Sequence, residues 1–171
     1  MPFLSEADQD QLKTIFAEQM ARRVRLRVLT RPPSKLYIPG EQLCASCAEA
    51  EPFARELATL SDKLEVVVHD VQAEPDLAEQ YGVRGLLPAI MLEPVSDEAA
   101  AGGGGGGAEA TQAPTHGTVR FLGLPAGYEF STLIADIVDV STGAVGLSET
   151  TQAELRGLEQ DLHLQVFVTP T

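Results

Sequence analysis

The chain has 171 residues, 44% of them hydrophobic, and a formal net charge of −13 at pH 7. This length and apolar content are enough for the core of one domain, or of one domain and part of another. Nucleic acids and anionic membranes are bound by basic surfaces, so the excess of acidic residues argues against both as the main partner.

The first expected element is an amphipathic helix over residues 6–21. Ser5 followed by Asp8 is typical of a helix N-cap with an acidic first turn, and apolar residues follow at helical spacing. Residues 1–10 are polar and acidic and show no secretory leader, and no apolar run approaches the roughly 20 residues of a membrane span. We therefore expect a cytoplasmic protein that does not act at a membrane.

Apolar and other residues alternate over 24–30, which predicts a β-strand. A later apolar pattern starts at Cys47 and predicts a helix of about 15 residues, with Pro52 inside it. Because a proline in a helix removes a backbone donor and crowds the preceding turn, we expect a kink there.

The only two cysteines of the chain, Cys44 and Cys47, stand at C-x-x-C spacing where this helix starts. Two thiols at that spacing can close a small disulfide ring, and the helix N-terminus favours the thiolate of the first. The pattern predicts thiol–disulfide exchange, in which Cys44 attacks a substrate and Cys47 resolves the mixed disulfide. Glu49 and Glu51 oppose the thiolate if they lie close, and the two residues between the cysteines bring no cation to help it.

Three further elements are expected before the next break in composition. The nearly all-apolar run 64–68 predicts a strand in the middle of a sheet that is covered on both faces. A short helix over 75–80, closed by Gly82, and a strand over 88–92 follow.

Residues 96–117 differ in composition from the rest and include six consecutive glycines. Such a stretch cannot offset its ordering entropy by burial, so we expect a flexible Gly-rich insertion at the tip of a hairpin. A return strand over 118–122, antiparallel to 88–92, and a closing helix over 130–140 follow. The order of elements predicts an α/β fold with a mixed sheet.

A pattern near the N-terminus recurs near the end of the chain. The motif Leu4–Glu6 returns as Leu147–Glu149, and each copy continues as an amphipathic helix. An alternating segment that predicts a strand, 162–168, follows the second copy. We interpret residues 1–146 as one domain and residues 147–171 as the opening helix and strand of an incomplete second unit. Chance similarity between two amphipathic helices is the alternative.

Metal binding is another use of a cysteine pair. Two thiolates form half of a tetrahedral zinc site, and two further ligands are then needed. The three histidines, His69, His116 and His163, have no ligand spacing to the cysteines. We expect neither a metal nor a cofactor, and we interpret His69 beside Asp70 as a surface or capping pair.

The segment Val83–Pro88, which precedes a predicted strand, completes a pattern with the C-x-x-C helix and its Pro52. This combination resembles the thioredoxin fold, an α/β fold with a mixed central sheet flanked by helices. The resemblance implies that residues 1–146 form a thioredoxin-like domain with Pro88 as a cis-proline opposite the dithiol. It also implies Leu87 and Pro88 as substrate-binding residues, with Pro88 supplying a backbone edge that pairs with the substrate chain.

Two further segments, 121–130 and 166–171, look like protein disulfide oxidoreductases, which are glutaredoxin-like proteins of two fused thioredoxin-fold units. In that family each unit usually carries a C-x-x-C, and the segment that matches 169–171 runs straight into the second one. Here the chain ends before such a motif, and an Ala-Ser dipeptide stands where the family more often has a proline or an aromatic residue. The resemblance covers residues 4–95 and 117–171.

The resemblance implies a thiol–disulfide oxidoreductase that reduces, forms or isomerises protein disulfides through Cys44 and Cys47. Its partners would be protein disulfide substrates and a thiol or flavoprotein reductase, with self-association through residues 147–171 as a further expectation. The alternative is a redox-inactive binding or dimerisation module with a vestigial dithiol. A third interpretation is an electron-relay domain that resembles the N-terminal part of the alkyl hydroperoxide reductase flavoprotein. The first unit of that protein usually lacks its cysteines, so Cys44 and Cys47 count against this interpretation.

Overall fold

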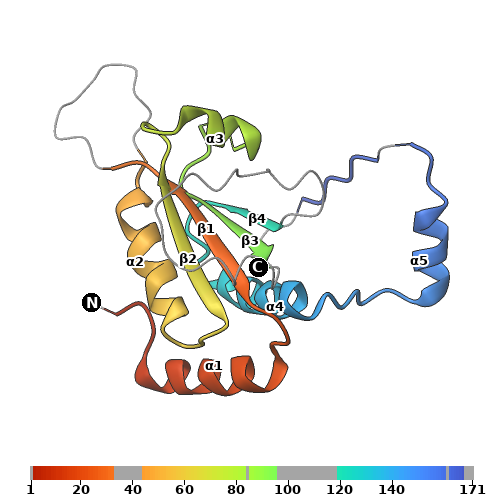
Figure 1. The fold of residues 1–171 in the computed structure, drawn as a ribbon, viewed down its shortest axis with the longest axis horizontal. Helices are drawn as coiled ribbons and strands as arrows, with labels where there is room; N and C mark the ends of the chain where they lie inside the picture. Colours follow the sequence, from red (N-terminus) through yellow and green to blue (C-terminus); the bar gives the residue numbers. More distant parts are fainter. Residues whose placement is uncertain (1, 33–43, 84, 96–118, 161, 168–171) are drawn as a thin grey trace.

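The structure is a computed structural model that describes residues 2–32, 44–83, 85–95, 119–160 and 162–167. Within these residues the chain forms a four-stranded sheet in the order β2-β1-β3-β4, with helices around it (Figure 1). No helix in this part of the chain is long and apolar enough to cross a bilayer. The elements in chain order are α1 (Glu6–Gln19), β1 (Val24–Thr30), α2 (Cys47–Ala58), β2 (Leu64–Asp70), α3 (Pro75–Gln80), β3 (Ala89–Pro94), β4 (Val119–Leu122), α4 (Tyr128–Thr142) and α5 (Glu149–Arg156).

The sheet is mixed, which confirms the α/β fold expected from the sequence. β1 pairs parallel with β2 and antiparallel with β3, and β3 pairs antiparallel with β4. The predicted antiparallel pairing of β3 and β4 is therefore confirmed, while the expected flexible insertion over 96–117 lies outside the described residues. α2 runs through Pro52, and the kink stays a prediction.

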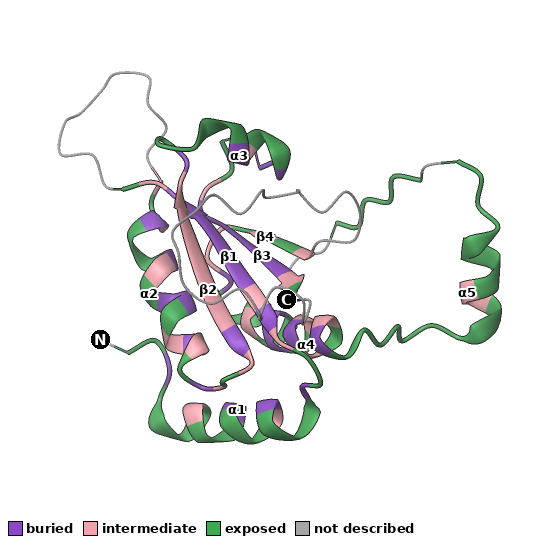
Figure 2. Ribbon diagram, viewed as in Figure 1, coloured by how far each residue is buried: buried purple, intermediate pink, exposed green. Residues whose placement is uncertain are grey.

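Apolar side chains on the two faces of the sheet hold the helices in place. Leu26 and Ile90 pack in a cluster with residues of α1, α2 and α4, whereas Leu29 and Met91 pack in a second cluster with α3. Because successive side chains of a strand point to opposite faces, these clusters lie on opposite sides of the sheet. Figure 2 shows that many residues of β1 and β3 are buried.

Local chemistry sets several helix ends as predicted. Ser5 Oγ accepts a 3.2 Å hydrogen bond from the backbone N–H of Asp8 at the start of α1. Gly143 ends α4 at a φ of 69°, a left-handed conformation that glycine adopts without steric cost. Gly82 follows α3 at a φ of 65°, and a Cβ there would come within 3.0 Å of the Arg120 guanidinium.

β2 does not occupy the central position that its apolar run predicts, and that prediction is wrong. Among the strands that the structure describes, it forms one edge of the sheet, while β1 and β3 lie in the middle. The arginines of β1 make a central position hard to predict from the sequence. They are accommodated in the middle of the sheet because carboxylates of the neighbouring strands neutralise them. Arg25 Nε lies 2.5 Å from Glu65 Oε1 on β2, and Arg27 Nε lies 3.0 Å from Glu93 Oε1 on β3.

The repeated sequence motif corresponds to a repeated structure at the starts of α1 and α5. In each helix a serine hydroxyl accepts a hydrogen bond from the backbone N–H three residues on, and a glutamine amide donates to the carbonyl oxygen five residues back. The residues are Leu4, Ser5, Asp8 and Gln9 in α1, and Leu147, Ser148, Thr151 and Gln152 in α5.

The strand predicted over 162–168 does not form in residues 162–167. This segment pairs with none of the described strands, and the side chains of Leu164 and Phe167 are 87% and 89% exposed. A strand is stabilised by a hydrogen-bonding neighbour and by burial of one face, and neither is present here. The assignment of residues 147–171 to a second unit stays a prediction.

Candidate active site

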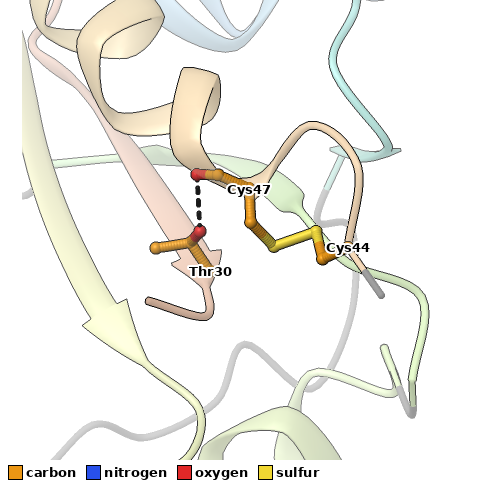
Figure 3. Close-up of a disulfide and its surroundings, with 3 residues drawn as sticks. All are labelled: Thr30, Cys44 and Cys47. Atoms are coloured by element: carbon orange, nitrogen blue, oxygen red, sulfur yellow. Dashed lines mark hydrogen bonds between the residues drawn. A yellow bond between two sulfur atoms is a disulfide. The ribbon is translucent and has the colours of Figure 1, made fainter. Parts of the chain in front are cut away.

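The pairing order of the strands brings several segments to one end of the sheet. Leu29, near the end of β1, is paired with Ala89 at the start of β3, and Ala89 is paired with Leu122 at the end of β4. The segments that leave β1, enter β3 and leave β4 therefore meet there. α2 begins at the same place, because Thr30 Oγ1 donates a 2.9 Å hydrogen bond to the backbone oxygen of Cys47 (Figure 3).

Cys44 and Cys47 are joined by a disulfide at this end of the sheet (Figure 3). The S–S distance is 2.01 Å and the Cα–Cα distance is 5.4 Å. Cys47 is the first residue of α2 and is 5% exposed, whereas Cys44 precedes the helix and is half-buried. The two predicted catalytic residues are thus brought together, with Cys44 as the more accessible of the pair.

A pocket of about 300 Å³ lies beside Cys44. Leu87, one of the two predicted substrate-binding residues, lines this pocket, whereas Pro88 is buried. The peptide bond between Leu87 and Pro88 is cis, as the resemblance to the thioredoxin fold implies. The lining residues are Arg31, Cys44, Gly85, Leu86, Leu87, Leu122 and Gly123.

Three side chains of this pocket, those of Arg31, Leu86 and Leu122, are not among the candidates that the sequence singles out. Leu86 and Leu122 are 55% and 54% exposed, which is more typical of a contact surface than of a core. Position in the topology is the signal that could have identified two of them. Arg31 directly follows β1 and Leu122 ends β4, and both strands finish at the end of the sheet where the disulfide lies.

The two acidic residues close to the dithiol in sequence have different surroundings. Glu51 Oε1 accepts a 2.8 Å hydrogen bond from Arg55 Nε one turn further along α2. Glu49 lies exposed in the first turn of the helix, and its negative charge opposes a thiolate at the helix N-terminus. Of the described residues that line the pocket, Arg31 alone carries a charge.

A charged cluster on the α3 face of the sheet supports the segment that leads to the pocket. Arg27 Nε and Nη2 donate to the two carboxylate oxygens of Glu93 at 3.0 and 3.1 Å, and the Tyr81 hydroxyl donates to Glu93 at 2.8 Å. Burial, followed by the hydrogen bond to Glu93, raises the pKa of Tyr81 to about 12, so the hydroxyl stays protonated at neutral pH. Tyr81 directly follows α3 and is 4% exposed, so it anchors the start of the segment that reaches Leu86 and Leu87.

His69 belongs to the same cluster and is not the surface or capping pair with Asp70 that the sequence predicts. Its side chain is 13% exposed, Nε2 lies 2.7 Å from Arg27 Nη1, and Nδ1 lies 3.0 Å from Glu74 Oε1. An arginine can only donate, so Nε2 accepts and the ring proton is on Nδ1. His116 lies outside the described residues, and among those that are described no three or more His, Cys, Asp or Glu side chains are grouped to hold a metal ion.

No family model and no curated protein matches the sequence, but solved structures match the fold. A mutant of the alkylhydroperoxide reductase AhpF from Enterococcus faecalis gives a TM-score of 0.64 at 21% identity, over 92% of this chain and 62% of that chain. The NTD N/C domain of the same reductase gives 0.63 at 21% identity, over 90% and 60%. A protein disulfide oxidoreductase from Aeropyrum pernix K1 gives 0.64 at 20% identity, over 92% and 56%.

These matches confirm that the fold is thioredoxin-like. At 20–21% identity the likeness is one of fold, and this chain spans between 56% and 62% of the length of the three proteins. One of them is a protein disulfide oxidoreductase, which is the class that the sequence resembles.

Proposed function

We propose that this chain is a thiol–disulfide oxidoreductase that acts on protein disulfides through Cys44 and Cys47. The observation that carries the proposal is the disulfide at the N-terminus of α2, whose more accessible cysteine borders a pocket lined by Leu87. The thioredoxin-like neighbours, which are named as a reductase and an oxidoreductase, support the same general class. The joined cysteines correspond to the state that such an enzyme reaches after reducing a substrate.

In the reducing direction, the Cys44 thiolate attacks one sulfur of a substrate disulfide, and the substrate S–S bond breaks. The departing sulfur takes a proton from solvent, while Cys44 stays joined to the substrate as a mixed disulfide. The Cys47 thiolate then attacks the Cys44 sulfur and releases the second substrate thiol, which is protonated in turn. Two electrons have passed to the substrate, and a thiol or flavoprotein reductase returns two electrons and two protons to the Cys44–Cys47 disulfide.

The backbone of Leu87 is the proposed pairing edge for the substrate chain. Pro88, which the sequence resemblance implies as that edge, has no amide hydrogen, and its carbonyl oxygen already accepts a 2.7 Å hydrogen bond from the backbone N–H of Gly123. A substrate segment added as a strand would therefore pair with Leu87. The exposed side chains of Leu86 and Leu122 favour substrates that carry apolar residues beside their disulfide.

Reduction of insulin by dithiothreitol, followed by the precipitation of the released chain, tests the proposal. We expect the protein to accelerate precipitation, and Cys44→Ser to abolish that acceleration because the attacking sulfur is gone. Protein that has been reduced and alkylated with iodoacetamide is the matched control, and it should be equally inactive. If the unmodified protein gives only the background rate, the proposal fails and the redox-inactive binding or dimerisation module remains.

A relay module is a second candidate, and the two matches to the alkylhydroperoxide reductase favour it. In this role the dithiol takes electrons from a flavoprotein and passes them to one partner protein. NADPH oxidation by a flavoprotein disulfide reductase in the presence of this chain distinguishes the two roles. Turnover with insulin as acceptor supports the general oxidoreductase, whereas turnover only with a thiol peroxidase supports the relay.

Two further expectations belong to this proposal. A cytoplasmic location suits a thiol–disulfide oxidoreductase, because a reducing compartment keeps a dithiol in its open form.

Self-association through residues 147–171 is supported by the exposed apolar side chains of Leu164 and Phe167. Sedimentation velocity of the chain and of a Leu164→Ser, Phe167→Ser variant checks it, because only the unaltered chain should form a dimer.

A further inference from the structure

Several charges near Cys44 determine how readily its thiolate forms. A thiolate is needed for attack, and the net charge of −13 works against a further negative charge. Glu49 in the first turn of α2 acts in the same unfavourable direction, while Glu51 is paired with Arg55. The helix N-terminus is thus left as the favourable influence within α2.

Arg31 reaches the same pocket from a different element. It directly follows Thr30, the last residue of β1, and Thr30 is tied to α2 by its hydrogen bond to the Cys47 carbonyl oxygen. Arg31 and Cys44 both line the pocket of about 300 Å³, and Arg31 is half-buried. A cation in that position acts with less screening than one on an open surface.

Apart from Arg31 and Cys44, the residues that the structure describes in the pocket wall are glycines and leucines, none of which can ionise. Apolar groups beside a sulfur displace water from it, which strengthens the effect of a nearby charge and disfavours an unpaired thiolate. Among the described lining residues, the charge that can compensate a thiolate on Cys44 is therefore that of Arg31.

We propose that Arg31 is the electrostatic determinant of this site and stabilises the Cys44 thiolate in the reduced protein. The inference rests on the proposed function and adds to it a residue outside the C-x-x-C motif. The hydrogen bond from Thr30 to α2 holds the end of β1, from which Arg31 extends, against the helix. Since Arg31 stabilises the open, reduced form, it makes the dithiol a stronger oxidant than the same motif without the arginine.

The test is the pH dependence of Cys44 alkylation by iodoacetamide in a Cys47→Ser background, where Cys44 is the single thiol. Arg31→Met retains an unbranched apolar stem but removes the charge. We expect it to raise the midpoint of the alkylation profile by about one pH unit, and so to slow alkylation about tenfold below the midpoint. Arg31→Lys should retain most of the original profile, because it retains the charge.

Arg156→Gln is the matched control, because it makes the same change in net charge on exposed α5. Its alkylation profile should not move. Coincident profiles for the parent and Arg31→Met would overturn the proposal, as would an equal shift in Arg156→Gln. If Arg31→Met does not fold, as judged by circular dichroism, Arg31→Gln and Arg31→Lys carry the same comparison. Alkylation needs no substrate, so its outcome is separate from that of the insulin assay, which tests the proposed function itself.

Discussion

Arg27 is a charged residue in the middle of the sheet, and its neighbours account for that position. It is 6% exposed, and it donates to both carboxylate oxygens of Glu93 and to His69 Nε2. Its guanidinium also lies 5.4 Å from the centre of the Tyr81 ring. Burying a charge is costly unless it is paired and hydrogen-bonded, and these contacts meet both conditions. The cluster therefore behaves as one unit in which each partner depends on the others.

Tyr81→Phe isolates the contribution of one hydroxyl to this unit. We expect the free energy of unfolding to fall by about 1–2 kcal/mol, because Glu93 loses a hydrogen bond but retains Arg27. Urea denaturation measures the change. Tyr128→Phe is the matched control, since Tyr128 is 80% exposed and should lose nothing. Similar losses in the two variants would show that the contact with Glu93 does not stabilise the fold.

The effect of Tyr81→Phe on the free energy of unfolding should depend on pH. The pKa of Tyr81 is raised from 10.0 to about 12, so between these values the native state holds a proton that the unfolded chain has released. The stability linked to this proton is complete below pH 10.0 and is lost as the pH rises through about 12. The difference in stability between the parent and Tyr81→Phe should therefore shrink as the solution is made alkaline. A difference that stays constant with pH would contradict this origin.

At the scale of elements, helix ends follow from local chemistry and strand positions do not. Ser5, Gly82 and Gly143 mark the ends of α1, α3 and α4 because a side-chain hydrogen bond or a left-handed glycine acts within a few residues. The position of β2 at one edge of the described sheet depends instead on which strands pair with β1. In the same way, whether residues 162–167 form a strand depends on a pairing partner, and none of the described strands pairs with them. The alternation of apolar residues along a segment predicts neither its position in the sheet nor its pairing partner.

The same distinction holds for the candidate site. Cys44 and Cys47 are recognised by their spacing, and the cis-proline Pro88 by resemblance to a known fold. Arg31 and Leu122 join them only through the pairing of β1, β3 and β4, which is a long-range property of the sheet. A single sequence states which residues can carry the chemistry, but it does not state which strand ends lie side by side.

Asp136, in α4, is a carboxyl group whose ionisation is disfavoured in the native state. Burial, and then the charge of Asp139, raises the pKa of Asp136. The native state holds this proton more tightly than the unfolded chain, so its contribution to stability is present in acid and is lost as the pH rises through the native pKa. Asp136→Asn should therefore raise the Tm at neutral pH, and the gain should disappear at acidic pH. A gain of the same size at both pH values in thermal denaturation would contradict this explanation.

At the scale of the whole molecule, the mixed sheet gathers the chemistry at one end. β1 and β4 finish there and β3 starts there, so the antiparallel pairing of β3 with both strands places a cation, a group of leucines and a cis-proline around the start of α2. Figure 1 shows α5 on the far side of the connecting segment from the sheet, and none of its residues is buried. The proposed exchange thus depends on the part of the chain that precedes α5.

The central claim is that Cys44 forms a covalent intermediate with a substrate disulfide, and trapping that intermediate tests it most directly. Reduced Cys47→Ser protein is mixed with a disulfide-bonded protein, and adducts are identified by mass spectrometry without a reductant. We expect an adduct joined through Cys44 that dithiothreitol releases, and far less adduct from Cys44→Ser, because its remaining cysteine, Cys47, is only 5% exposed. The absence of any adduct, or equal adduct from the two variants, would contradict it.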